Sequence, residues 1–176
     1  VKEKVRSVLL PLWNATSFLT RYADLDGWEP DFVDPDPKVN ELDGWVLSRL
    51  QGLIGTVDER MQNYELFRVV PALLEFIDDL TNWYIRRSRR RFWRGAGGAD
   101  MDKQNAYRTL HRVLLDLSRV LAPFLPFISE EIHENLSAGR STGSVHLRNF
   151  PEVDSQFVNA DLERGMGLAR TAVTLG

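Results

Sequence analysis

Six arginines lie within nine residues near the middle of the chain, together with two aromatic residues. The arginines are Arg86, Arg87, Arg89, Arg90, Arg91 and Arg94, and the aromatic residues are Phe92 and Trp93. A guanidinium group presents N–H donors in a planar fork that matches phosphate oxygens, and aromatic rings offer faces on which unpaired bases stack. This composition favours RNA binding. The predicted contacts are Arg86, Arg87, Arg89, Arg90, Arg91, Phe92 and Trp93.

The position of the arginines on their helix leaves two interpretations open. At about 100° per residue, the apolar stripe that ends at Tyr84 continues into Arg87 and Arg91. In the structural interpretation, the arginines pair with carboxylates of a neighbouring helix, such as those in 130–134. In the functional interpretation, the helix end protrudes and its guanidiniums bind phosphates. Pairing of both Arg87 and Arg91, with only one or two free guanidiniums, would weaken the RNA interpretation.

The charge distribution supports a local basic site on an acidic protein. The chain of 176 residues has a formal net charge of −3. Residues 61–112 nevertheless carry 10 Lys and Arg against 6 Asp and Glu, whereas 1–60 carry 7 against 11 and 113–176 carry 5 against 8. Nucleic-acid binding depends on where positive charge is concentrated more than on its total.

Other chemistry has little support. The three histidines, His111, His133 and His146, lie on different segments, and Glu130-x-x-His133 occurs once, whereas metal sites in bundles use this spacing twice. We interpret 128–134 as a solvated helix face. The absence of Cys excludes disulfides, thiolate catalysis and Cys-ligated zinc. Without a G-x-x-x-x-G-K-[ST], G-x-G-x-x-G or G-x-S-x-G motif, we predict no catalytic residue, metal site or cofactor in this chain.

Apolar residues recur at helical spacing along most of the sequence. The first helix is expected over 5–19, with Pro11 either kinking it or marking the start of its second half. An acidic loop over 24–36 is interpreted as a solvated connector, with a divalent-cation loop as the alternative. The second helix begins near Asn40, with Asp43 as a capping-box partner. Its apolar stripe ends with Met61 and Tyr64.

The remaining segments complete a helical bundle. A third helix runs from about residue 65 into the arginines, with Trp83 and Tyr84 in the core, and ends at Gly95-Ala-Gly-Gly98. A fourth is capped by Asp100 or Asp102, a fifth covers 128–136, and a last one 161–175. Residues 144–147 are expected to form a short strand or extended arm. Long helices with short connections predict an all-α antiparallel bundle. No run approaches the roughly 18 apolar residues of a membrane span.

The stretch 78–93 (DDLTNWYIRRSRRRFW) resembles the signature helix of isoleucyl-tRNA synthetases of the eukaryote-like branch. The stretches 9–15 (LLPLWNA), 42–50 (LDGWVLSRL) and 122–132 (APFLPFISEEI) agree, as does 144–147 with Pro151, so the resemblance covers about residues 3–151. The stretches 42–50 and 122–132 are also similar to valyl- and leucyl-tRNA synthetases. Gly44 departs from the family, which usually has a bulky or basic residue there. This departure argues against an RNA contact at that helix start.

The resemblance implies a helical bundle that binds the anticodon stem-loop of tRNA(Ile). It implies a parent ligase that forms isoleucyl-adenylate from ATP, with Mg, and charges tRNA(Ile) in the cytoplasm. The parent's two ATP-site signatures, His-Ile-Gly-His-like and Lys-Met-Ser-Lys-Ser-like, are absent from these 176 residues. The chain alone is therefore expected to be inactive and to hold no cofactor.

The expected domains are the anticodon-binding domain, 1–151, and the truncated start of a C-terminal segment, 152–176. The expected partners are tRNA(Ile) and the remaining domains of the synthetase, with no membrane. The alternative function is a helical bundle that contacts a protein or another domain without touching RNA.

Overall fold

The computed structural model describes residues 5–94, 100–137 and 143–175, and these ranges contain helices and loops but no strand. The α-helices are α2 (Leu10–Asp26), α3 (Glu41–Gln62), α4 (Leu66–Asp78), α5 (Arg86–Trp93), α6 (Met101–Leu121), α7 (Pro126–Leu136) and α8 (Ala160–Leu175). Two π-helical segments, η1 (Val5–Leu9) and η2 (Asp79–Ile85), and two 3-10 turns, η3 (Val145–Leu147) and η4 (Ser155–Phe157), complete the elements. The predicted all-α fold is confirmed.

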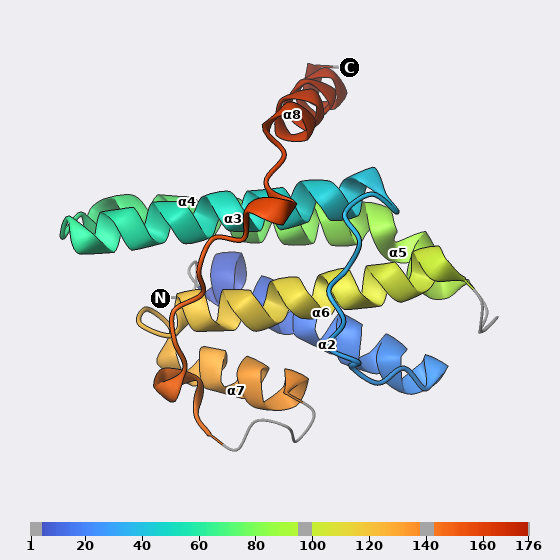
Figure 1. Cartoon of the computed structure of the whole chain (residues 1–176), viewed down its shortest axis with the longest axis horizontal. Coiled ribbons are helices and arrows are strands. Elements are labelled where there is room, and N and C mark those ends of the chain that lie inside the picture. The colour runs from blue at the N-terminus through green and yellow to red at the C-terminus, as the bar shows by residue number, and fades with distance from the viewer. Residues whose placement is uncertain (1–4, 95–99, 138–142, 176) are drawn as a thin grey trace.

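The long helices run in alternating directions (Figure 1). α3 lies against α4, and α4, η2 and α5 continue one another toward the end of the molecule where α6 begins. α6 returns between this layer and a second layer formed by α2 and α7. α8 packs on α3 at the top of Figure 1. The arrangement confirms an antiparallel bundle and places the arginine-rich α5 at one end of it.

α6 is the central helix of the bundle. Its leucines Leu110, Leu114, Leu117 and Leu121 recur at helical spacing and are buried. Polar residues on its other sides are buried as well, because α2, α3, α5 and α7 all contact this helix. A helix covered on several sides must satisfy its polar groups within the protein.

Several helix boundaries follow from local capping chemistry. The Asn40 side chain accepts a hydrogen bond from the Leu42 amide at 3.0 Å, and Asp100 accepts from the Lys103 amide at 3.2 Å, so the predicted start of α3 is confirmed and Asp100 caps α6. Pro11 lies in the first turn of α2, directly after η1, and so marks where the second half of this helical segment begins. Tyr64, predicted on the inner stripe, is 91% exposed because α3 ends at Gln62.

Residues 144–147 do not form the predicted strand or arm. Ser144 caps the 3-10 turn η3 by accepting from the His146 amide. Glu130 accepts from the Ser144 hydroxyl at 2.9 Å and from the Val145 amide at 2.8 Å. A short segment with no strand beside it gains more from these local bonds than from an extended conformation. The predicted helix end at 95–98 lies outside the described residues.

Gly44 lies where the loop before α3 and the helix α8 both approach α3. A Cβ atom at this position would lie 2.6 Å from the Pro37 carbonyl oxygen and 3.2 Å from Leu162 Cδ2. The close approach requires glycine and covers this turn of α3 with protein. The departure from the bulky or basic residue of the family therefore has a packing explanation.

Gly44→Ala is expected to lower the free energy of unfolding by about 1–3 kcal/mol, because the new methyl group overlaps backbone that must move. Gly52→Ala on the same helix is the matched control, since a Cβ there meets nothing within 4 Å. The control should be neutral or stabilising by up to about 1 kcal/mol. Urea unfolding followed by circular dichroism measures both, and equal effects would contradict the packing argument.

Candidate nucleic-acid interface

The π-helical segment η2 sets which arginines of α5 face outward. A regular α-helix that continued the apolar stripe of α4 through Leu73, Phe76 and Leu80 would turn Arg87 inward. Instead, Tyr84, Ile85, Ser88, Arg91 and Phe92 are buried, so the inward face after Tyr84 takes Ser88 in place of Arg87. A π-helical turn contains more residues than an α-helical one. The residues that follow it are therefore rotated about the helix axis, and Arg87 lies on the outside.

Arg91 is an interior residue, which corrects its prediction as an RNA contact. It is 5% exposed. Its two terminal nitrogens donate to the two oxygens of Asp43 at 2.6 and 2.7 Å, and one also lies 2.7 Å from Asp102 Oδ1. The Asp43 carboxylate accepts two further bonds, from the Tyr84 hydroxyl and the Asn105 amide, both at 2.8 Å. Asp43 is therefore the partner of a buried ion pair and does not act as a capping-box residue.

The electrostatics of this pair keep the Arg91 guanidinium charged. Burial alone would lower the pKa of the Arg91 guanidinium, but its hydrogen bonds to Asp43 and the attraction between the two charges raise that pKa above its ordinary value. Burial raises the pKa of Tyr84, and the adjacent Asp43 charge raises it further, so the hydroxyl remains a donor. The carboxylates expected in 130–134 play no part here.

Phe92 is also interior, at 1% exposed. Its ring meets Phe18 edge-on with centroids 5.0 Å apart and Tyr107 edge-on at 5.0 Å, and Tyr22 lies 6.3 Å away. Such contacts between aromatic rings join α5 to α2 and α6. No base can stack on this ring, so Phe92 is reassigned to the core.

Five predicted residues remain on the surface: Arg86, Arg87, Arg89, Arg90 and Trp93. Within the part of the chain that the structure describes, none of the four arginines has a carboxylate at ion-pair distance. Arg87 lies over the ring of Trp83, 3.5 Å from guanidinium carbon to centroid, while Trp83 itself is half-buried. Trp93 is 58% exposed. The four unpaired guanidiniums leave the RNA interpretation open, although Arg91 is paired.

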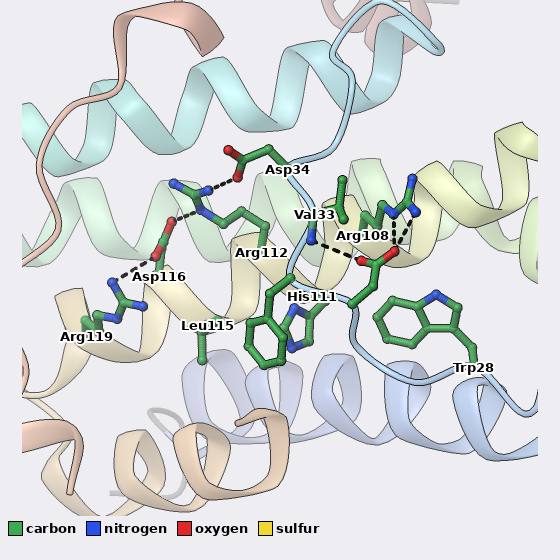
Figure 2. A pocket seen from close by; sticks show the side chains of 11 residues that line it. Trp28, Val33, Asp34, Arg108, His111, Arg112, Leu115, Asp116 and Arg119 are labelled. Atoms are coloured by element: carbon green, nitrogen blue, oxygen red, sulfur yellow. Dashed lines mark hydrogen bonds and ion pairs between the residues drawn. The ribbon is translucent and has the colours of Figure 1, made fainter. Parts of the chain in front are cut away.

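The basic residues of α6 contrast with those of α5, because the acidic loop neutralises them. Asp31 accepts from Arg108 at 2.5 Å, and Arg112 pairs with Asp34 and with Asp116. Figure 2 shows the chain of contacts from Asp34 through Arg112 and Asp116 to Arg119, which lines a pocket of about 300 Å³.

The same loop is held at its two ends. Lys103 lies 2.6 Å from Asp26, and Asn105 bonds the backbone of Asp36 in both directions. Most residues of the loop are exposed, as predicted for a solvated connector, but ion pairs also dock it on α6.

His111, His133 and Glu130 have structural roles. His111 is buried against the Leu136 carbonyl, 2.8 Å from Nε2, and burial lowers its pKa. Glu130 bonds residues 144 and 145, and His133 is buried, so 128–134 is not the solvated face that was predicted. No group of His, Asp and Glu suited to a metal ion occurs among the described residues. None of the described helices is long and apolar enough to cross a membrane.

Sequence reasoning missed the residues that complete this region. Asp43 was assigned to a cap, although it is buried in the structure, where an aspartate is rarely found unless it is paired. Trp13 and Arg21, eight residues apart on α2, lie near Trp93 in one pocket. Their spacing places them on one helix face, but pattern alone cannot show that α5 lies against that face.

Comparison with known proteins identifies the class of this bundle. The family described as "Anticodon-binding domain of tRNA ligase" matches residues 43–175. The chain belongs to this family of anticodon-binding domains.

Curated relatives are isoleucine–tRNA ligases. That of Chlamydia abortus is 46% identical over 177 residues, that of Chlamydia trachomatis serovar D 44% over 176, and that of Chlamydia pneumoniae 43% over 172. These alignments cover 100%, 100% and 98% of this chain but only 17%, 17% and 16% of the relatives. The resemblance to isoleucyl-tRNA synthetases is confirmed, and the chain spans about a sixth of their length.

Arg91→Ala is expected to lower the free energy of unfolding by about 3–5 kcal/mol, because it leaves the buried Asp43 charge without its ion-pair partner. Arg90→Ala, one residue away and exposed, should change it by no more than about 0.5 kcal/mol. Urea titration of both variants makes the comparison. Similar small effects would show that the buried pair does not stabilise the bundle.

Proposed function

We propose that this chain binds the anticodon stem-loop of tRNA(Ile) within an isoleucine–tRNA ligase. The observation that carries the proposal is the set of four exposed guanidiniums on α5, at Arg86, Arg87, Arg89 and Arg90, without carboxylate partners among the described residues. Phosphate contacts from such groups supply much of the affinity of a protein for nucleic acid. Membership of the anticodon-binding family and the names of the relatives support RNA as the ligand.

In this proposal the parent ligase uses ATP and Mg to activate isoleucine in the cytoplasm, through parts of the protein outside this chain. An apolar groove of about 760 Å³ suits contact with those parts. It is lined by residues of η1, α4 and the turn between α6 and α7, including Leu9, Val70, Leu74 and Phe124. Because the groove lies apart from the α5 arginines, the other domains of the ligase and the tRNA bind different surfaces of the bundle in this proposal.

The central test reverses charge on α5. Arg86→Glu, Arg89→Glu and Arg90→Glu together should weaken binding of tRNA(Ile) at least tenfold near physiological salt. The log–log salt dependence should become shallower by roughly two units, at about 0.7 per lost phosphate contact. Stability should change little, because all three side chains are exposed. Filter-binding titrations at several salt concentrations measure affinity and slope.

A matched control separates local contacts from net charge. Arg6, Arg68 and Arg164 are exposed on η1, α4 and α8, and their replacement by Glu changes the net charge equally. This control should keep most of the affinity and the slope. Wild-type affinity and slope in the α5 variant would reject the RNA proposal and favour a contact with protein.

A second test concerns catalysis. The chain alone is expected to give no isoleucine-dependent exchange of pyrophosphate into ATP, with or without tRNA, because the proposal assigns amino-acid activation to the rest of the ligase. A measurable exchange rate above a protein-free blank would contradict that assignment.

A further inference from the structure

A concave pocket of about 460 Å³ lies between α2 and α5. We call it the α2–α5 pocket. Trp13, Arg21 and Tyr22 of α2 line it from one side, and Arg89 and Trp93 of α5 from the other. Its volume lies within the roughly 300–1,000 Å³ of sites that hold small molecules. The pocket therefore adds a recessed surface from a second helix to the exposed arginines.

The walls of the pocket offer aromatic faces that the fold does not cover. Trp13 is 45% exposed and Trp93 58% exposed. Phe18 also lines the pocket, and its ring centroid lies 4.8 Å from Tyr22 and 5.0 Å from the buried Phe92. Because Phe18 is held by this core cluster, the pocket is formed before any ligand arrives. A preformed site loses less conformational entropy on binding.

The polar groups of the pocket suit the edge of a planar ring. The Trp93 indole N–H donates to the Tyr22 hydroxyl oxygen at 2.6 Å, which leaves the hydroxyl proton of Tyr22 available as a donor. Asn14 and Ser17 line the same pocket and add an amide and a hydroxyl. Unpaired bases are recognised by this combination of stacking and hydrogen bonds to their edges.

The charge of the pocket is positive and unneutralised. Arg21 and Arg89 line it, no acidic residue does, and neither arginine has an ion-pair partner in the described parts of the chain. The pocket in Figure 2, by contrast, includes Asp34 and Asp116 beside its arginines. A ligand that combines a flat aromatic ring with a negative charge matches the α2–α5 pocket, and a nucleotide has both.

We propose that the α2–α5 pocket receives one unpaired base of the bound RNA loop, which stacks on tryptophan while the adjoining phosphate lies near Arg21 and Arg89. This proposal rests on the proposed function, since it places one nucleotide of that RNA. It assigns to α2 a part of the binding surface, whereas the arginine run lies on α5 alone.

The test uses the anticodon stem-loop of tRNA(Ile) with 2-aminopurine replacing one loop nucleotide at a time. Stacking on an indole ring quenches this fluorescent base. At saturating protein, the wild-type chain should quench one loop position more strongly than the others, and Trp13→Ala or Trp93→Ala should reduce that quenching. Arg86→Glu with Arg90→Glu should weaken the affinity yet keep the quenching at saturation.

Affinity measurements provide a second readout. Trp13→Ala should weaken binding of the loop by roughly 5- to 150-fold without changing the salt slope, the equivalent of one lost stacked base. Arg21→Gln should weaken binding and reduce the slope by about 0.7. Phe127→Ala, which removes a 91% exposed aromatic from α7, is the control and should bind as the wild type does. Trp13→Phe should recover part of the loss.

The outcomes separate the two proposals. Equal quenching in the wild type and both tryptophan variants, with unchanged affinity for Trp13→Ala, would overturn the pocket while leaving RNA binding by α5 intact. A wild-type chain that binds neither the stem-loop nor whole tRNA(Ile) would overturn the proposed function, and the pocket with it. Circular dichroism of each variant shows that it is folded.

Discussion

The ion pair between Asp43 and Arg91 joins the start of α3 to the last turn of α5 inside the bundle. Asp43 accepts four hydrogen bonds, from two arginine nitrogens, Tyr84 and Asn105. Asn105 also bonds the acidic loop through the backbone of Asp36. Two charges removed from water remain stable only when such bonds satisfy them. Because one carboxylate contacts α3, η2, α5 and α6, the placement of the arginine helix depends on it.

The π-helical segment η2 decides how the arginines are divided between interior and surface. It shifts the phase of the helix between α4 and α5, so that Ser88 and Phe92 pack inward with Arg91. Phe92 then meets α2 and α6 through Phe18 and Tyr107. One arginine and one aromatic residue anchor α5, and this anchoring leaves Arg86, Arg87, Arg89 and Arg90 exposed, without carboxylate partners among the described residues. π-helical turns are frequent at functional sites.

The sequence was sufficient to predict the helices, their order and the all-α bundle, because apolar spacing and capping residues such as Asn40 and Asp100 are local signals. It was not sufficient to predict which residues of α5 face inward. A helical projection at a uniform 100° per residue does not include the extra residue of a π-helical turn. The sequence also could not identify the ion-pair partner of Arg91, because Asp43 lies 48 residues away along the chain. The docking of the acidic loop on α6 was not predicted for the same reason. Its aspartates pair with arginines that are distant in the sequence and come close only in the folded chain.

The distribution of ion pairs explains how an acidic protein can present a local basic surface. The loop carboxylates Asp31 and Asp34 are used on α6, so they neither compete for the α5 arginines nor add to the repulsion of an approaching phosphate there. Phosphate contacts orient an RNA but carry no sequence information. Discrimination between bases requires directional donors and acceptors. Beside these arginines such groups lie in the α2–α5 pocket, where the Tyr22 hydroxyl is already held by Trp93. In the proposed RNA interface, affinity and selectivity therefore derive from adjacent but different helices, α5 for charge and α2 for the base.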